Sequence, residues 1–151
     1  MPAPAAFTEV IGVDAALFSK EENLFLEMAL FYQVVSELKR LFHKQWKLYF
    51  HLVAIKPKEE TMQETHYLRC IINDIIRSET YTLSGIAVYT HEPFDSIYEV
   101  VSGENTSPSW RLWRKIVDLH RTVRPELYQG IMRKLLSIEP EVLFQVGASK
   151  G

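Results

Sequence analysis

The sequence predicts an all-α protein, and three observations support this. Apolar residues recur every three or four positions along most of the 151-residue chain, which is the spacing of one helix face. Prolines and glycines stand between these periodic segments, and no segment shows the pattern of a convincing strand. With 47% apolar residues the chain can build a core, and its length suits one compact domain or a small domain with an appended helical arm.

Charge and cysteine content limit which kinds of partner and which cellular location we expect for the protein. A formal charge of −2 argues against a protein that coats nucleic acid through bulk charge, although local patches still matter. The single cysteine, Cys70, cannot form an intrachain disulfide, so a cytoplasmic location is expected. We expect neither export nor membrane insertion, because a signal pattern is missing and no apolar run approaches about 20 residues.

Residues 1–60 are expected to form an N-terminal arm and a long amphipathic helix that mediates assembly. The arm, residues 1–19, shows no period and is expected to be loose. From Lys20 to about Val53, large apolar residues alternate in steps of four and three. The residues of this seam are Leu24, Met28, Phe31, Val35, Leu38, Phe42, Tyr49 and Leu52. An isolated helix would leave the seam in water, so it either folds back on its own domain or pairs with a second copy in a homodimer.

Residues 61–138 are expected to form a separate domain of short helices. The long helix should end at Pro57, which cannot donate to the helical ladder. Thr61 and Glu64 then form a capping box, which opens an amphipathic helix of about four turns. Its apolar side chains are Leu68, Ile71, Ile72, Ile75 and Ile76.

Two short helices follow, separated by a tight turn. Thr82 is expected to cap the first, which runs to about Tyr89. Pro93 suits the first turn of the second, which should stop at Gly103 because glycine readily takes the left-handed conformation of a helix end.

The last two predicted helices also begin at prolines. Ser107 followed by Pro108 is expected to open one helix, and Pro125 opens another that runs to about Ile138. Residues 139–151 are expected to form a flexible tail.

This order of helices resembles the Cro-like and lambda-repressor-like (XRE-type) helix-turn-helix family of transcription regulators. The family's second and third helices read L-A-x-x-x-G-[VI]-S-x-x-[TS]-I-x-x-[IVW]-E-x-G, and residues 86–103 read IAVYTHEPFDSIYEVVSG. The matching residues are Ile86, Ala87, Ser96, Ile97, Val100 and Gly103, followed by a helix opening at Ser107, Pro108 and Ser109. The resemblance covers about residues 65–122. It implies a five-helix domain that reads duplex DNA in transcription regulation as a dimer, formed through either the long N-terminal helix or the fifth helix.

The sequence departs from the family where DNA is normally contacted. His91 occupies the turn position that is usually glycine, so it must adopt a left-handed or altered turn. Leu83 and Val101 replace a phosphate-binding glutamine and a buried glutamate of the family. From Ser78 to Trp110 there are five acids and no Lys or Arg, whereas DNA affinity rests largely on neutralising phosphates.

The resemblance and the residue chemistry together predict a set of DNA-binding residues. Base contacts are expected from Phe94, Asp95, Tyr98 and Glu99 on the reading helix, and phosphate contacts from hydroxyl side chains. The positive charge that the reading helix lacks is expected from the cations of the following helix. The set is Thr82, Ser84, Phe94, Asp95, Tyr98, Glu99, Thr106, Ser107, Arg111, Arg114 and Lys115. A second basic region, residues 38–58, contains no acid and interleaves its cations with aromatic residues. It either tracks a nucleic-acid backbone, lies on a membrane, or forms the solvated side of a packed helix.

In an alternative hypothesis, the helix-turn-helix fold binds a protein partner instead of DNA. The acidic surface from Glu92 to Glu104 would then dock a basic protein partner and bind no DNA. The sign of the potential around Phe94 to Glu99 distinguishes the two hypotheses, and a membrane-peripheral function is the weakest of the three.

Enzymatic chemistry finds little support in the sequence. The five histidines are scattered and none has Cys or carboxylate neighbours at metal-ligand spacing. Cys70 sits among isoleucines and is interpreted as a core residue. We therefore expect no catalytic residue, metal or cofactor.

Overall fold

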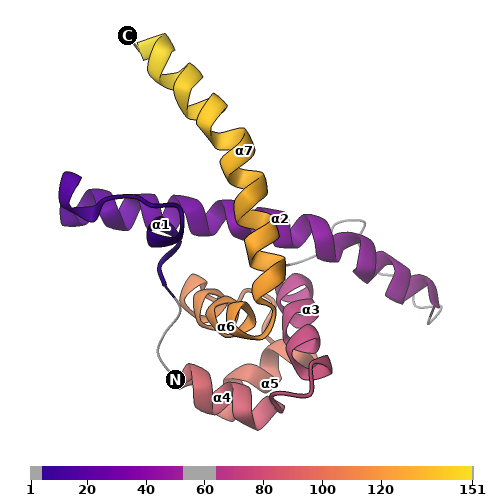
Figure 1. The fold of residues 1–151 in the computed structure, drawn as a ribbon. Coiled ribbons are helices and arrows are strands. Elements are labelled where there is room, and N and C mark those ends of the chain that lie inside the picture. The colour runs from indigo at the N-terminus through magenta and orange to yellow at the C-terminus, as the bar shows by residue number, and fades with distance from the viewer. Residues whose placement is uncertain (1–4, 53–63, 151) are drawn as a thin grey trace. The chain divides into compact units, whose positions relative to one another are not determined.

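The computed structural model describes residues 5–52 and 64–150, with side chains described for residues 5–44 and 65–137. All regular elements in these ranges are helical and none is a strand, which confirms the all-α prediction (Figure 1). The elements are α1 (Phe7–Val10), the 3-10 turn η1 (Ala15–Leu17), α2 (Lys20–Leu52), α3 (Glu64–Arg77), α4 (Leu83–Thr90), α5 (Phe94–Ser102), α6 (Trp110–Val123) and α7 (Pro125–Lys150).

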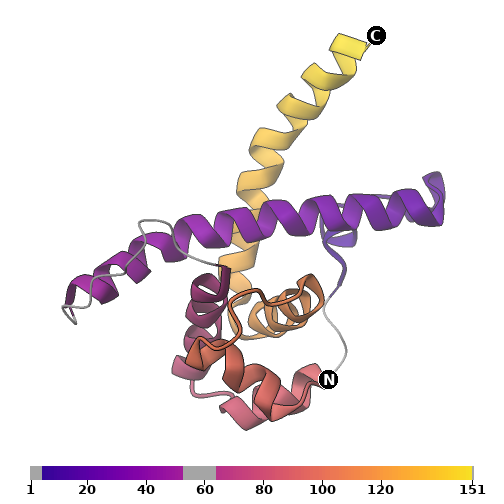
Figure 2. The ribbon, with the colours of Figure 1, turned by 180° about the vertical axis from the view of Figure 1, so that it is seen from behind.

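The chain divides into two compact units. Unit 1 consists of residues 1–37 and 125–151, and unit 2 is the continuous segment 38–124. Helix α2 passes from one unit into the other, as its unbroken ribbon shows in both views (Figures 1 and 2). The expected boundary at residues 60 and 61, with Pro57 and the capping box of Thr61, lies outside the described residues.

Unit 1 gives structure to part of the N-terminal arm. Phe7 in α1 is fully buried, and its ring stacks on that of Phe31 in α2 with centroids 6.4 Å apart. The backbone N–H groups of Phe7 and Thr8 each donate to the Glu27 carboxylate at 2.9 Å. The expectation of a loose arm is therefore wrong for this segment. One buried aromatic ring and one carboxylate cap order it, and such a short segment shows no period in the sequence.

Helix α7 also belongs to unit 1. Its buried side chains, Tyr128, Ile131, Met132 and Leu135, recur at helical spacing, and the Lys134 ammonium pairs with Glu37 at 2.8 Å. The helix starts at Pro125 as predicted but continues to Lys150, so the expected end near Ile138 is wrong. A proline can kink a helix without ending it, and Pro140 lies inside α7.

Unit 2 is a bundle in which α3 packs on α5 and α6, and α4 packs on α5 and α6. Most of the apolar residues predicted to hold these helices together are buried: Leu68, Ile71, Ile72, Ile75, Ile86, Ala87, Ile97, Val100, Leu112, Trp113, Ile116, Val117 and Leu119. Ile76 is only partly buried, and Trp110, expected to pack, is 51% exposed at the first position of α6. Each fully buried isoleucine stabilises the fold by about 1.5–3 kcal/mol, before entropy is counted. This core fixes how α4 and α5 are presented to solvent.

The helix ends in unit 2 follow the predictions with two shifts of position. Thr82 caps α4 by accepting the Gly85 N–H at 3.1 Å, and Gly103 ends α5 with φ of 86°. Pro93 is the cap residue of α5 and not its first helical residue. Ser109 caps α6 in place of Ser107, because the Ser109 Oγ accepts the Leu112 N–H at 3.1 Å.

Candidate nucleic-acid interface

The turn between α4 and α5 is left-handed, which is one of the two outcomes expected for His91. His91 has φ of 55° and ψ of 35°, and its N–H donates to the Val88 carbonyl at 3.3 Å. The Glu92 N–H donates to the Ala87 carbonyl at 3.1 Å. These bonds close α4 and direct the chain into α5 within three residues. For a residue other than glycine, this left-handed conformation raises the free energy of the folded state by about 1–2 kcal/mol.

Helix α5 is sharply divided into a buried and an exposed face. Ile97 and Val100 are fully buried, while Phe94, Tyr98 and the carboxylates at 95 and 99 are exposed. The Phe94 and Tyr98 rings stack with centroids 6.2 Å apart and an interplanar angle of 19°. The structure thus places all four predicted base-contacting residues, Phe94, Asp95, Tyr98 and Glu99, on one solvent-facing surface, which we call the α5 face.

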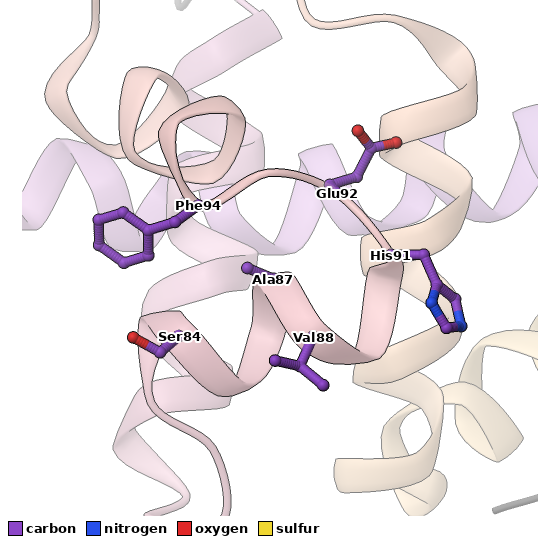
Figure 3. Close-up of a pocket in the computed structure, with 6 residues that line it drawn as sticks. All are labelled: Ser84, Ala87, Val88, His91, Glu92 and Phe94. Atoms are coloured by element: carbon purple, nitrogen blue, oxygen red, sulfur yellow. The ribbon is translucent and has the colours of Figure 1, made fainter.

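An open hollow of about 510 Å³ lies between α4 and the start of α5. Figure 3 shows Phe94 and Ser84 at one end of the hollow and Glu92 and His91 at the other end. Ala87 lies between these two ends. Val88 projects from α4 and is 75% exposed, which is high for a branched apolar side chain. The hollow therefore joins the outer side of α4 to the α5 face.

The predicted phosphate-binding hydroxyls lie at or near helix starts. Thr82 and Ser84 are exposed at the beginning of α4, and Thr106 and Ser107 are exposed before α6. The Thr82 oxygen accepts a bond from Gly85, yet its hydroxyl hydrogen can still donate to another acceptor. All four are accessible from solvent.

Two of the three predicted cations on α6 are neutralised within the chain. Arg114 and Arg121 both donate to Asp118, at 3.2 and 3.1 Å, and the Lys115 ammonium lies 2.8 Å from Glu92. The third, Arg111, is exposed and makes no ion pair with any side chain between residues 65 and 137. The Lys115 contact joins residues 23 apart in sequence, so no local spacing rule could have revealed it.

The second basic region is partly used for packing. The Lys39 ammonium lies over the Tyr67 ring at 5.7 Å and over the Trp113 ring at 5.9 Å from the centroids. Arg40 and Lys44 are exposed, while the side chains of Lys47, Lys56 and Lys58 lie outside those described. Lys39 therefore behaves as a helix cation packed on aromatic rings.

The two units differ in charge. Residues 38–124 contain thirteen Lys and Arg against ten Asp and Glu, a formal charge of +3. The remaining residues contain four against nine, a formal charge of −5. The whole-chain value of −2 thus hides a basic unit 2 and an acidic unit 1.

A polar cluster around the buried His120, which the sequence did not reveal, connects α3 with the end of α6. The fully buried His120 ring lies with Nε2 2.7 Å from Asp74, and Arg124 donates to both Asp74 oxygens at 3.0 Å. Burial alone would raise the pKa of Asp74, but the hydrogen bond from His120 and the charges of His120, Arg124 and Arg77 lower it. The cluster is far from the α5 residues in sequence and satisfies a histidine inside the core.

Cys70 and the possible metal ligands are also candidates for reactive groups. Burial raises the pKa of the Cys70 thiol to about 12, against a smaller lowering by Arg69. Among the described residues no three His, Cys, Asp or Glu side chains are grouped to hold a metal ion.

The predicted assembly seam on α2 is split. Phe31, Val35, Leu38 and Phe42 are buried within the chain, whereas Leu24 and Met28 are 61% and 62% exposed. The side chains of Tyr49 and Leu52 lie outside those described. Four seam residues are thus unavailable to a second copy, because the chain's own core uses them. The exposed remainder continues into Phe25 and Tyr32, which are 73% and 60% exposed.

Comparison of the chain with protein-family models, curated proteins and solved structures finds no match. None of the helices within residues 5–52 and 64–150 has both the length and the apolar character needed to cross a membrane.

Proposed function

We propose that the chain is a sequence-specific DNA-binding transcription regulator that acts as a dimer. It uses α4, the turn at His91 and α5 as a helix-turn-helix of the Cro/repressor-like kind. The observation that carries this proposal is the α5 face. Buried Ile97 and Val100 fix the helix from below, while its first residues point to solvent beside α4. A helix presented in this way fits the major groove with its N-terminal residues toward the bases.

The charge of unit 2 supports DNA as the ligand. Its formal +3 favours approach to a polyanion, while the acids of unit 1 explain why the whole chain is slightly negative. Phosphates would be held by Arg111, by the hydroxyls of Thr82, Ser84, Thr106 and Ser107, and by backbone N–H groups at the starts of α4 and α6. Because few cations take part, we expect weak non-specific binding and a shallow salt dependence.

The test is selection from a pool of random duplexes at about 50 mM salt, followed by titration of the enriched site. Arg111→Glu should weaken binding equally across sequences, since it acts on phosphate, whereas Tyr98→Ala should change which sequences are preferred. Arg133→Glu on α7 makes the same charge change in unit 1 and should have no effect. Absence of enrichment and of binding to any duplex would overturn the proposal.

A second candidate, docking of a basic protein, is favoured by one observation. Val88 is 75% exposed and Phe94 and Tyr98 are nearly half exposed, next to the carboxylates of Asp95 and Glu99. Apolar area ringed by one sign of charge is typical of a protein-docking surface. This candidate predicts no duplex binding, together with binding of a Lys-rich amphipathic peptide that is lost in Val88→Asp.

A further inference from the structure

The chemistry of the α5 face restricts what it can read in a groove, if the proposed DNA-binding function holds. Guanine is read bidentately by Arg or Lys, and adenine by Asn or Gln. From Thr82 to Glu104, which includes all of α4 and α5, the chain contains none of these four residue types. The reading helix therefore lacks the side chains that recognise purines through two hydrogen bonds.

What the α5 face does offer is complementary to pyrimidines. The carboxylates of Asp95 and Glu99 only accept hydrogen bonds, and the cytosine N4 amino group is the donor that pyrimidines present in the major groove. The Phe94 ring is 44% exposed and apolar, which suits the C5-methyl group of thymine. Both recognised groups lie on the pyrimidine of a base pair.

The surroundings leave these groups available. Phe94 stacks on Tyr98, which limits the freedom of its ring, and it forms a wall of the hollow together with Ala87 and Ser84 (Figure 3). Asp95 lies in the first turn of α5, where the helix dipole stabilises a negative charge. Glu92 is not part of this set, because Lys115 holds its carboxylate at 2.8 Å.

We infer that α5 reads a pyrimidine-rich strand, with Phe94 against thymine methyl groups and the carboxylates of Asp95 and Glu99 on cytosine amino groups. Residues 95 and 99 are four apart, which is about 6 Å along the helix. This matches roughly two base-pair steps of about 3.4 Å, so the two carboxylates address different base pairs.

The first experiment compares two duplexes of the selected site that differ only by uracil in place of thymine. Loss of a methyl group that packs on Phe94 should weaken binding about fourfold per site, from about 0.8 kcal/mol for each buried methylene-sized group. In Phe94→Ala the thymine and uracil duplexes should bind equally. Leu136→Ala, which truncates an exposed apolar side chain on α7 outside the α2 seam, should keep the fourfold difference.

The second experiment changes the hydrogen-bonding pattern at one position. Asp95→Asn replaces an acceptor-only group with one that can donate and accept, so the preferred base at one position should change from cytosine to adenine by roughly tenfold. The residue is exposed, and unchanged circular dichroism would exclude unfolding as the cause. Equal binding of thymine and uracil duplexes, with an unchanged preference in Asp95→Asn, overturns the inference and leaves DNA binding standing. Absence of binding to every duplex overturns both.

Discussion

The ammonium of Lys115 on α6 lies 2.8 Å from the carboxylate of Glu92, directly after the turn between α4 and α5. The two side chains are only 24% and 20% exposed, so the pair is partly shielded from water. The pair joins the residue before Pro93 and α5 to helix α6. It also neutralises Lys115, which the sequence predicts to bind phosphate.

Glu92→Gln should therefore tighten duplex binding. The amide oxygen still accepts a bond from Lys115, but the negative charge that neutralises it is gone. We expect binding several-fold tighter at low salt and a salt slope steeper by about one, measured by fluorescence polarisation. Glu104→Gln, the same charge change on an exposed acid after α5, should leave the slope unchanged. Equal effects of the two variants would show that only overall charge matters.

The Asp74 cluster should make the fold sensitive to acid. The folded chain holds the pKa of Asp74 below its unfolded value, so the carboxylate stabilises the fold at neutral pH. This contribution should be complete above about pH 4 and disappear as the pH falls through the lower folded pKa. Urea unfolding followed by circular dichroism at a series of pH values measures it.

Asp74→Asn should remove that acid-sensitive contribution and destabilise the fold at neutral pH by about 1–3 kcal/mol, because His120 and Arg124 lose a charged partner. Asp118→Asn is the comparison, because this carboxylate also accepts from two arginines but is 26% exposed, against 14% for Asp74, and has no buried histidine as partner, so a smaller loss is expected. A variant at position 74 as stable as the control would show that the cluster does not support the core.

Two glycines should respond oppositely to alanine. Gly103 has φ of 86° and space around it, so Gly103→Ala should destabilise by about 1 kcal/mol or more through backbone strain alone. Gly130 lies within α7 with nothing within 4 Å of an added methyl group, so Gly130→Ala should stabilise by about 0.5–1 kcal/mol. Thermal unfolding of both variants tests the signs, and a stabilising Gly103→Ala would contradict the left-handed end of α5.

Cys70 should be inert in the folded protein. Its thiol is buried and has a pKa of about 12, so little thiolate forms at pH 8. A thiol reagent should react slowly with the native chain and rapidly in denaturant. Fast labelling without denaturant would mean that the α3 core opens readily.

The split seam on α2 separates assembly from folding. Met28→Asp changes an exposed side chain and should lower self-association in sedimentation while leaving the circular dichroism unchanged. Val35→Asp places a carboxylate at a position 1% exposed and should unfold the protein. If Met28→Asp leaves the oligomeric state unaffected, this face does not mediate dimerisation.

Much of the architecture could be predicted because local rules govern it. The caps at Thr82 and Gly103, the start of α7 at Pro125 and the apolar spacing of α3 to α6 all follow from short-range chemistry. The α5 face could be predicted for the same reason, since two buried residues at helical spacing determine which neighbours are exposed.

The rest depends on contacts between distant residues. The pairing of Lys115 with Glu92 and of His120 with Asp74 requires knowing which helices touch. The seam on α2 had a continuous pattern, yet the pattern alone could not show which of its residues the chain buries itself. Phe7 was missed because a single aromatic residue has no period.

The division of the chain bears on how it folds during synthesis. Unit 2 is one continuous segment, whereas unit 1 is completed only when residues 125–151 join residues 1–37. During synthesis on a ribosome, α3 to α6 can therefore pack before α7, which completes unit 1 together with the first part of α2, has been made. The exposed and buried apolar side chains near residues 24–35 would meanwhile be accessible to chaperones or to a second nascent chain. Loss of the last helix would leave unit 1 unfinished while leaving the segment that contains the α5 face complete.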